Sequence, residues 1–356
     1  MRIWEFVVTG GPCAGKTTGL SVLEKTLTNK GFKVIVVAET ATELISSGIC
    51  PWEIENEIFQ SLLISRALNK EETTRKAAEA LKKDTVIFYD RGLLDNKAYM
   101  SQKMFEKILA ENGMTEIDAR EKYDGVFHLV TAAEGAEEFY TLANNEARTE
   151  TVEQAKELDL KTRNSWVGHP HLRIIDNSTD FNQKIGRLLE EVYSTMGLPI
   201  PIETERKFLI KKPAESLLEG ISGITKLKIL QTYLHSDDPS VERRIRQRGD
   251  GNSYAYIYTE KRNISAISRQ ETERRISKDE YLALLMEGEK SILKNRFCFV
   301  HKNQYFELDM YQNWENEAIL EIELTSENQE VSIPEWIEVI KEVTEDSAYK
   351  NYNLAK

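Results

Sequence analysis

The chain has 356 residues, enough for two domains that each bury a core. It carries 47 Lys and Arg against 59 Asp and Glu, and this formal charge of -12 argues against general binding to nucleic acid or to a membrane surface. The cysteines, Cys13, Cys50 and Cys298, are far apart and indicate neither a zinc site nor a disulfide framework. Since the N-terminus shows no signal-peptide pattern and no apolar segment is long enough to span a bilayer, we expect a cytoplasmic protein.

A phosphate-binding loop follows the first predicted strand. Residues 3–8 form a short apolar run, and residues 10–17 read GGPCAGKT, which matches the pattern G-x-x-x-x-G-K-[ST]. A helix predicted at residues 16–29 points its positive end at the bound phosphates. The motif predicts that Lys16 reaches the β- and γ-phosphates and that Thr17 offers its hydroxyl to Mg²⁺. The residues expected to bind ATP here are Gly10, Gly11, Gly15, Lys16, Thr17 and Thr18.

Two further strands deliver acidic residues to the same edge of the predicted sheet. Residues 33–38 form an apolar strand that leads to Glu39 at the carboxyl edge, where α/β proteins bind their ligands. Residues 85–89 form another strand that ends in Asp90, the expected second Mg²⁺ anchor of a P-loop enzyme. The remaining predicted elements are a helix at residues 52–82 and strands at residues 125–130 and 172–175.

A polar, mostly helical segment separates the last two of these strands. It spans residues 131–169 and contains Arg148 and Arg163. In small-molecule kinases this position holds a lid whose arginines stabilise the transferring phosphoryl group. We therefore expect both arginines at the ATP site, and the alternative is that they are ordinary exposed arginines.

Residues 1–195 resemble the AAA_28 family of P-loop ATPases, which are relatives of nucleotide and nucleoside kinases. The resemblance is carried by residues 10–18, 38–40, 90–92 and 166–178. It implies an α/β P-loop domain with a parallel sheet flanked by helices, but it does not define a phosphoryl acceptor. In the related nucleoside kinases an acidic residue at the end of the second strand serves as the base, and Glu39 is the residue that could play that part here.

A change of pattern marks the domain boundary. Residues 197–201 read GLPIP, which predicts a short and stiff linker because glycine and alternate prolines break the preceding helix. We expect a first domain at residues 1–196 and a second at residues 202–356. After the linker, helical spacing gives way to strands with period-two charge.

Charged residues of one sign alternate with apolar residues along the strands of the second half. Residues 203–207 read ETERK, so in an extended strand Glu203, Glu205 and Lys207 share one face. A solvated sheet face could have this pattern. A barrel with the charged face inward would need water, metal and a highly charged ligand inside it. Because carboxylates suit divalent ions and arginine offers forked donors to phosphate oxygens, the pattern favours a metal-bound polyphosphate.

This half is similar to the CYTH superfamily, also called the triphosphate tunnel metalloenzymes. The motifs that carry the resemblance follow one another in order at residues 203–207, 244–246, 259–261, 269–273, 294–296, 307–309 and 321–323. The resemblance implies an antiparallel eight-stranded β tunnel, or barrel, with helices outside. It also implies hydrolysis or cyclisation of triphosphates with Mg²⁺ or Mn²⁺.

The same resemblance implies roles for individual residues. The metal ligands would be Glu203, Glu205, Asp309, Glu321 and Glu323. The triphosphate ligands would be Lys207, Arg244, Arg246, Lys261, Lys294 and Arg296, with Arg269 as a further one. Glu271 or Glu273 would join the acidic lining. The candidate catalytic residues of the two domains are then Glu203, Glu205, Lys207, Glu273, Glu39 and Asp90.

The two halves together predict a bifunctional phosphoryl-transfer protein. The tunnel would hydrolyse inorganic triphosphate, thiamine triphosphate or a nucleoside triphosphate, and the P-loop domain would hydrolyse ATP or phosphorylate a small molecule. Alternatives are a class IV-type adenylyl cyclase, an RNA 5′-triphosphatase, and a tunnel that senses polyphosphate and regulates the P-loop ATPase. We expect nucleotides and triphosphates as partners, with Mg²⁺ or Mn²⁺ and ATP as cofactors, and neither nucleic acid nor a membrane. The acceptor and the oligomeric state do not follow from the sequence.

Overall fold

The computed structural model describes residues 1–139, 151–198, 205–238, 240–263, 269–324 and 329–356, without the side chains of residues 262–271. The chain divides into two compact units, Met1–Val192 and Tyr193–Lys356. Most of the linker predicted at residues 197–201 lies outside the described ranges, so the domain boundary stays a prediction.

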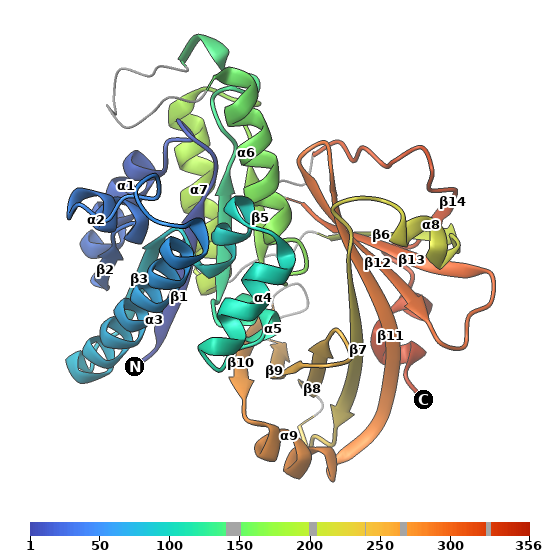
Figure 1. Cartoon of the computed structure of the whole chain (residues 1–356). Coiled ribbons are helices and arrows are strands. Elements are labelled where there is room, and N and C mark those ends of the chain that lie inside the picture. The colour runs from blue at the N-terminus through green and yellow to red at the C-terminus, as the bar shows by residue number, and fades with distance from the viewer. Residues whose placement is uncertain (140–150, 199–204, 239, 264–268, 325–328) are drawn as a thin grey trace. The chain divides into compact units, whose positions relative to one another are not determined.

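The first unit contains a five-stranded sheet with the order β2-β3-β1-β4-β5, and every neighbouring pair of strands is parallel. Helices flank this sheet (Figure 1). The strands are β1 (Ile3–Thr9), β2 (Lys33–Val37), β3 (Thr85–Asp90), β4 (Gly125–Leu129) and β5 (Leu172–Ile175). The helices are α1 (Lys16–Asn29), α2 (Thr40–Ser46), α3 (Asn56–Leu81), η1 (Leu93–Tyr99), α4 (Gln102–Glu111), α5 (Glu116–Glu121), η2 (Glu137–Phe139), α6 (Val152–Ser165) and α7 (Phe181–Met196). The last turn of α7 already belongs to the second unit.

The apolar runs predicted as strands are the buried strands of this sheet. β1 is buried from Trp4 to Thr9, and all five residues of β4 are buried. Because the strands are parallel, their carboxyl ends meet at one edge, where α/β proteins bind ligands. The phosphate loop follows β1, Glu39 follows β2, and Asp90 ends β3, so the predicted α/β fold is confirmed together with this shared edge.

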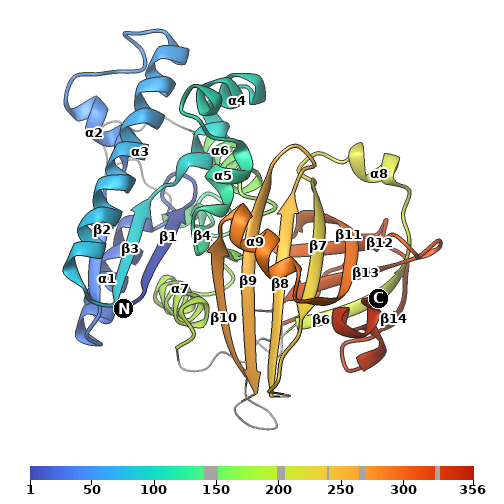
Figure 2. The same cartoon turned by 90° about the horizontal axis from the view of Figure 1, so that it is seen from below.

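The second unit contains a nine-stranded antiparallel sheet with the order β10-β9-β8-β7-β11-β12-β13-β6-β14. Figures 1 and 2 show this sheet strongly curved. Its strands are β6 (Glu205–Lys211), β7 (Thr225–Leu234), β8 (Val241–Gly249), β9 (Tyr254–Asn263), β10 (Arg269–Ile276), β11 (Gly288–His301), β12 (Gln304–Tyr311), β13 (Glu317–Glu323) and β14 (Val339–Glu342). Its helices are α8 (Glu215–Glu219), α9 (Lys278–Leu285), η3 (Ser347–Tyr349) and α10 (Asn351–Leu354).

The antiparallel sheet with helices outside is confirmed, but the eight-stranded closed barrel is wrong. The sheet has nine strands, and its end strands β10 and β14 do not pair with each other in the part of the chain that the structure describes. β14 is short and pairs only with the outer side of β6. It consists of four exposed residues without the alternating charge of the other strands, so the charge pattern gave no signal for it.

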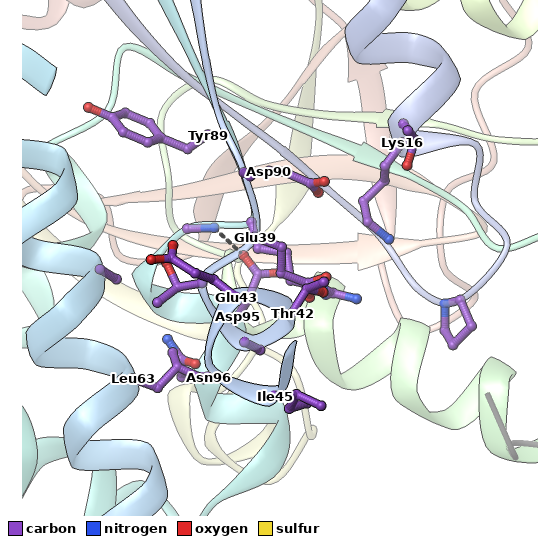
Figure 3. Close-up of a pocket in the computed structure, with 18 of the residues that line it drawn as sticks. Lys16, Glu39, Thr42, Glu43, Ile45, Leu63, Tyr89, Asp90, Asp95 and Asn96 are labelled. Carbon is purple, nitrogen blue, oxygen red and sulfur yellow. Dashed lines mark hydrogen bonds and ion pairs between the residues drawn. The ribbon is translucent and has the colours of Figure 1, made fainter. Parts of the chain in front are cut away.

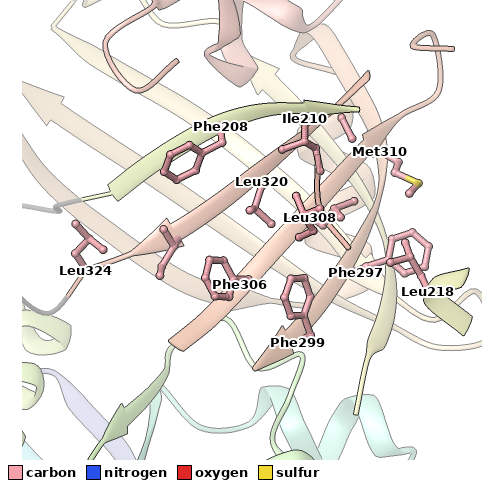
Figure 4. Packing of buried hydrophobic residues seen from close by; sticks show 13 residues of the cluster. Phe208, Ile210, Leu218, Phe297, Phe299, Phe306, Leu308, Met310, Leu320 and Leu324 are labelled. Carbon is pink, nitrogen blue, oxygen red and sulfur yellow. The ribbon is translucent and has the colours of Figure 1, made fainter. Parts of the chain in front are cut away.

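The two faces of the sheet differ as the alternation predicts. On β12 and β13, every second residue joins one apolar cluster (Figure 4). Leu218 of α8 packs into the same cluster, and Tyr281 of α9 packs behind β8 against Ile245. The intervening charged residues therefore occupy the opposite face, which we call the charged face. Among the described residues, no helix is long and apolar enough to cross a bilayer.

Candidate functional sites

The phosphate loop has a backbone shape that only glycine tolerates at two positions. Gly10 and Gly15 have φ values of 138° and 89°. A Cβ atom on Gly10 would lie 2.0 Å from the carbonyl oxygen of Leu129, and one on Gly15 would lie 2.6 Å from the ring of Phe181. The loop therefore needs glycine at both positions. It leads directly into the N-terminus of α1, whose positive end favours a bound anion.

Lys16 lies over this loop and lines a cavity of about 1190 Å³. Its Nζ donates hydrogen bonds to the carbonyl oxygens of Gly10 (3.1 Å) and Gly11 (3.0 Å). Figure 3 shows Lys16, Glu39 and Asp90 around the same cavity. The predicted residues that line the cavity are Gly15, Lys16, Thr17, Thr18, Glu39 and Asp90.

The two acidic residues of this cavity have different surroundings. Glu39 accepts hydrogen bonds from Arg91 Nε (2.6 Å, at Oε1) and from Thr42 Oγ1 (2.8 Å, at Oε2). Asp90 Oδ1 is buried and has no hydrogen-bond partner in the described part of the chain. An orphaned carboxylate oxygen in the cavity that Thr17 also lines fits Mg²⁺, which prefers oxygen ligands.

Burial and neighbouring charges change the protonation behaviour of the cavity. Burial and the Arg91 charge lower the pKa of Lys16 to about 8. Burial raises the pKa of Asp90. Burial also opposes ionisation of Glu39, but the charges of Arg91 and Lys16 outweigh it and hold the pKa of Glu39 below its ordinary value. Glu39 is thus ionised and oriented, as a proton acceptor must be.

Asp159 on α6 is a residue of this site that the sequence did not reveal. It is buried, and its Oδ1 accepts hydrogen bonds from the backbone N–H groups of Gly11 (2.6 Å) and Thr131 (3.1 Å). His128 Nε2 lies 3.2 Å from its Oδ2. Asp159 therefore ties the first turn of the phosphate loop to a helix far away in sequence, and no local motif marks such a contact.

Asp95 is a second anchor to which the sequence motifs around β3 assign no role. It accepts hydrogen bonds from the hydroxyl of Thr9, from the backbone N–H of Gly92 (2.7 Å) and from Trp166 Nε1 (3.3 Å). Arg91 Nη1 lies 3.5 Å from it. Asp95 thus holds the turn after β3 in place and, with it, the arginine that binds Glu39.

The predicted lid arginines are not both placed. Arg148 lies outside the described residues. Arg163 lies on α6, one turn after Asp159, and is half-buried but does not line the cavity. Burial lowers its pKa, while the charges of Asp159 and Glu134 act in the opposite direction. A lid role for either arginine stays a prediction.

On the charged face of the second unit, predicted metal ligands and predicted phosphate ligands contact each other directly. Lys294 pairs with Asp309, and both are buried. Arg296 donates to Asp309 Oδ1 through Nε (2.7 Å) and to Glu321 Oε2 through Nη2 (2.9 Å). Arg296 also pairs with Glu307. Arg296 on β11 contacts Glu321 on β13 although β12 lies between these strands. Such a contact is expected on the concave side of a curved sheet.

The network continues to β6 and the rim of the sheet. Lys207 Nζ lies 3.1 Å from both Glu321 Oε1 and Glu205 Oε1. Burial lowers the pKa of Lys207, but the charges of Glu321 and Glu205 outweigh it and raise that pKa overall. Glu205 lies directly opposite Glu323 in the ladder, where like charges repel unless a cation sits between them. Glu203 lies outside the described residues.

Three arginines follow one another on the charged face of β8. Arg244, Arg246 and Arg248 alternate along the strand, and Arg246 Nε donates to Gln231 Oε1 (3.3 Å). Burial lowers the pKa of Arg246, and the charges of Arg244, Arg296 and Arg248 lower it further, while the charge of Glu273 acts in the opposite direction. This part of the face therefore gathers several cations, of which Arg244 also pairs with Glu242 (3.6 Å).

β9 and β10 contribute less to the described network. Glu273 accepts a hydrogen bond from Thr259 Oγ1 (3.1 Å). Lys261 is half-buried and stands opposite Glu271 in the ladder. The side chains of Glu271 and Arg269 lie outside the described part of the chain, so their predicted roles stay predictions.

The donor chemistry of the charged face fits a divalent ion only in part. Two pairs of carboxylates stand opposite each other in the ladder, Glu205 with Glu323 and Glu307 with Glu321. Within the described residues, no group of three or more His, Cys, Asp or Glu side chains is arranged to hold a metal ion. Opposed carboxylates suit Mg²⁺ or Mn²⁺, and a metal role for them remains a proposal.

Comparisons with known proteins identify the first half. A family model described as an AAA domain, AAA_28, matches residues 5–184. No curated protein matches the chain. Two solved structures are similar to its C-terminal part, each with 30% sequence identity over 43% of this chain. One is "the crystal structure of the hypothetical protein NE1496", of which 97% is covered with a TM-score of 0.33. The other is "the crystal structure of the inorganic triphosphatase NE1496", of which 93% is covered with a TM-score of 0.32.

Proposed function

The chain belongs to the AAA_28 family through residues 5–184, and from this premise we propose that it is a phosphoryl-transfer enzyme with two separate sites. The P-loop domain binds ATP with Mg²⁺ and either hydrolyses it or passes its γ-phosphoryl group to a small acceptor. The charged face of the second unit hydrolyses a triphosphate, which is inorganic triphosphate, thiamine triphosphate or a nucleoside triphosphate.

The arginine cluster of β8 and β11 is the observation that carries the proposal for the second unit. Arg246 lies among Arg244, Arg248 and Arg296, whose charges lower its pKa. Carboxylates compensate part of this charge, since Arg244 pairs with Glu242 and Arg296 with Glu307, Asp309 and Glu321, and a bound anion would compensate more of it. A triphosphate would supply several negative charges, and guanidinium groups offer forked donors to its oxygens.

The other side of the charged face supplies acids and a lysine. Glu321 stands between Lys207 and Arg296, and these cations hold its pKa low, so it is ionised at neutral pH. Glu205, Asp309, Glu321 and Glu323 would hold Mg²⁺ or Mn²⁺, with Glu203 as a further candidate. The metal would withdraw charge from the phosphates and lower the pKa of a bound water. Lys207, Lys294 and Arg296 would exchange carboxylate partners for phosphate oxygens.

Hydrolysis then needs an in-line attack on a terminal phosphorus. The oxygen of a water molecule forms a new P–O bond, the bond to the bridging oxygen breaks, and the leaving diphosphate takes that electron pair. An acidic side chain of the face, Glu205 or Glu273, accepts the water proton. Lys261 and Arg269 are the remaining candidates for holding the diphosphate.

In the P-loop domain, the loop positions the nucleotide and Glu39 serves as proton acceptor. Lys16 would move from its carbonyl partners to the β- and γ-phosphates, and Thr17 with Asp90 would hold Mg²⁺. Glu39, oriented by Arg91 and Thr42, would take the proton of the attacking hydroxyl or water.

Phosphate release from inorganic triphosphate tests the proposal for the second unit. We expect metal-dependent release by the wild type and a loss of at least a hundredfold in Arg246→Ala, which removes the centre of the cation cluster. Arg243→Ala is the matched control, because Arg243 is on the same strand but pairs with Glu287 and Tyr258 on the other face. Equal effects of the two variants would contradict the proposed site, and cyclic nucleotide formed from ATP would indicate a cyclase instead.

A further inference from the structure

The ATP cavity extends beyond the phosphate loop into a chamber formed by α2, α3 and η1. Its total volume of about 1190 Å³ exceeds the roughly 300–1,000 Å³ of a typical pocket for a single small ligand. Space therefore remains for a second molecule beside the terminal phosphate of ATP. The chamber is lined by Ala41, Ile45, Phe59, Gln60, Leu63 and Asn96.

The charges around the cavity restrict what this second molecule can be. The lining contains the carboxylates Glu39, Glu43, Glu71, Asp90 and Asp95, against only Lys16 and Arg91 as cations. Lys16 faces the phosphates of ATP, and Arg91 is bound to both Glu39 and Asp95. Among the described lining residues, no cation is left to bind an anionic group of a second ligand.

The cations that neutralise the other two lining carboxylates lie outside the lining. Arg66 and Lys70 pair with Glu43, and Lys122 pairs with Glu71. A phosphate or carboxylate on the second ligand would thus approach Glu39 and Asp90 without compensation, and like charges in one site exclude the wrong partner.

Gln60 is an independent sign that a ligand belongs in this chamber. It is 5% exposed, lines the chamber from α3, and its Oε1 is buried with no hydrogen-bond partner in the described part of the chain. A buried amide oxygen without a donor lowers stability, so such groups in native proteins call for an explanation. Phe59 and Leu63 on the same helix supply an apolar wall next to it.

We propose that this chamber binds the phosphoryl acceptor of the P-loop domain, and that the acceptor is a small, uncharged or cationic hydroxyl compound with an N–H or O–H group that donates to Gln60 Oε1. The inference rests on the proposed function, because it needs ATP at Lys16. It adds the chemical class of the acceptor, which excludes compounds that already carry a phosphate.

The transfer step uses the residues around the terminal phosphate. The hydroxyl oxygen of the acceptor attacks the γ-phosphorus, and a new P–O bond forms. The bond from the γ-phosphorus to the β–γ bridging oxygen breaks, and ADP leaves with that electron pair. The hydroxyl proton passes to Glu39, whose carboxylate is already oriented by Arg91 and Thr42. The products are ADP and the phosphomonoester of the acceptor.

Matched pairs of acceptors test the charge rule with the full chain. Uridine, adenosine and thiamine are each compared with their monophosphates, and ADP formation from ATP with Mg²⁺ is measured above the rate without an acceptor. The rate of Lys16→Ala is subtracted, which removes ATP turnover by the second unit. We expect stimulation by at least one unphosphorylated compound, with a kcat/KM at least tenfold above that of its monophosphate.

Gln60→Leu tests the recognition residue. The KM for the stimulating compound should rise at least tenfold, and by more than the KM for ATP, because the substitution keeps the size of the side chain and removes its acceptor oxygen. Glu72→Gln on the same helix is the control and should match the wild type, because Glu72 is exposed and its ion pair is with the exposed Lys76.

The outcomes separate this inference from the proposed function. Equal or better use of the monophosphates, stimulation by neither set, or an unchanged acceptor KM in Gln60→Leu would each overturn the inference while ATP turnover that depends on Lys16 remained. Absence of any ADP formation that depends on Lys16 would overturn the proposed function of the P-loop domain, and the inference with it.

Discussion

The phosphate loop and the charged face, which we propose as the two phosphate sites, are built in different ways. The loop is a contiguous segment of eight residues, 10–17, whose shape depends on Gly10 and Gly15 and whose donors are backbone N–H groups. The charged face collects long side chains from separate strands, and its donors are guanidinium and ammonium groups such as Arg246 and Lys294.

The difference lies in how each site compensates its own charge. In the loop, a single cation, Lys16, donates to carbonyl oxygens, and its pKa is lowered to about 8 by burial. On the charged face, Lys207, Lys294 and Arg296 are paired with carboxylates, and the charges of neighbouring arginines help to lower the pKa of Arg246. Backbone geometry therefore determines how the phosphate loop would bind an anion. On the charged face, the balance between opposite charges determines it.

We expect the largest effect from removing the charge of Glu321, which pairs with both Lys207 and Arg296 on the charged face. Glu321→Gln should lower metal-dependent triphosphate hydrolysis by about a thousandfold, because it removes one metal ligand and leaves Lys207 and Arg296 without their shared partner. ATP turnover that depends on Lys16 should stay at the wild-type rate. Steady-state phosphate release with each substrate measures both, and equal loss of the two activities would mean that the domains share one site.

Breaking the loop should give the reverse pattern. Lys16→Ala should weaken ATP binding by the P-loop domain by about a hundredfold, because it removes the cation that meets the β- and γ-phosphates. Triphosphate hydrolysis by the second unit should not change. Calorimetric titration with ATP and Mg²⁺ gives the affinity, with Lys25→Ala on the same helix as the control. A normal affinity in Lys16→Ala would rule out the loop as the ATP site.

A smaller effect should come from the anchor of the loop. Asp159→Asn keeps the size of the side chain but weakens its bonds to the N–H groups of Gly11 and Thr131. A charged hydrogen bond of this kind contributes about 1.5–3 kcal/mol, so the KM for ATP should rise on the order of tenfold. Kinetics at several ATP concentrations separate this loss from a change in kcat. An unchanged KM would show that the loop keeps its shape without Asp159.

The smallest effect concerns acid stability of the second unit. The pKa of Glu321 is held low by Lys207, Lys294 and Arg296, so its contribution to stability is present above the ordinary glutamate pKa of about 4.5 and is lost as the pH falls below it. Glu321→Gln should therefore be less stable at pH 7, on the order of 1–2 kcal/mol, and this difference should shrink toward pH 3. Urea unfolding at both pH values provides the measurement, and a difference independent of pH would contradict the assignment.

Much of the first unit was predictable because its signals are local. The helix predicted at residues 16–29 and the strand at residues 172–175 match α1 and β5, since apolar runs bounded by loops define buried strands in a parallel sheet. Asp159 was not predictable, because its contact with Gly11 joins residues 148 positions apart and leaves no trace in either segment.

In the second unit, the sequence predicted which face of the sheet each side chain occupies better than how the edge strands of the sheet pair. The alternation along β12 and β13 correctly separates the apolar cluster from the charged face, because side chains of a strand alternate. It could not give the number of strands or the open order of the sheet, which depend on how the edge strands pair. Arg248 continues the row of Arg244 and Arg246, so the same alternation could have revealed it.

One measurement tests most directly the claim that the chain has two independent phosphate sites. Phosphate release is followed for the wild type, Lys16→Ala and Arg246→Ala, each with inorganic triphosphate and with ATP, in Mg²⁺ and then in Mn²⁺. If the two sites are independent, Arg246→Ala loses triphosphate hydrolysis and keeps the ATP turnover that depends on Lys16, while Lys16→Ala does the opposite. Loss of both activities in either variant, or triphosphate hydrolysis that survives in Arg246→Ala, would contradict it.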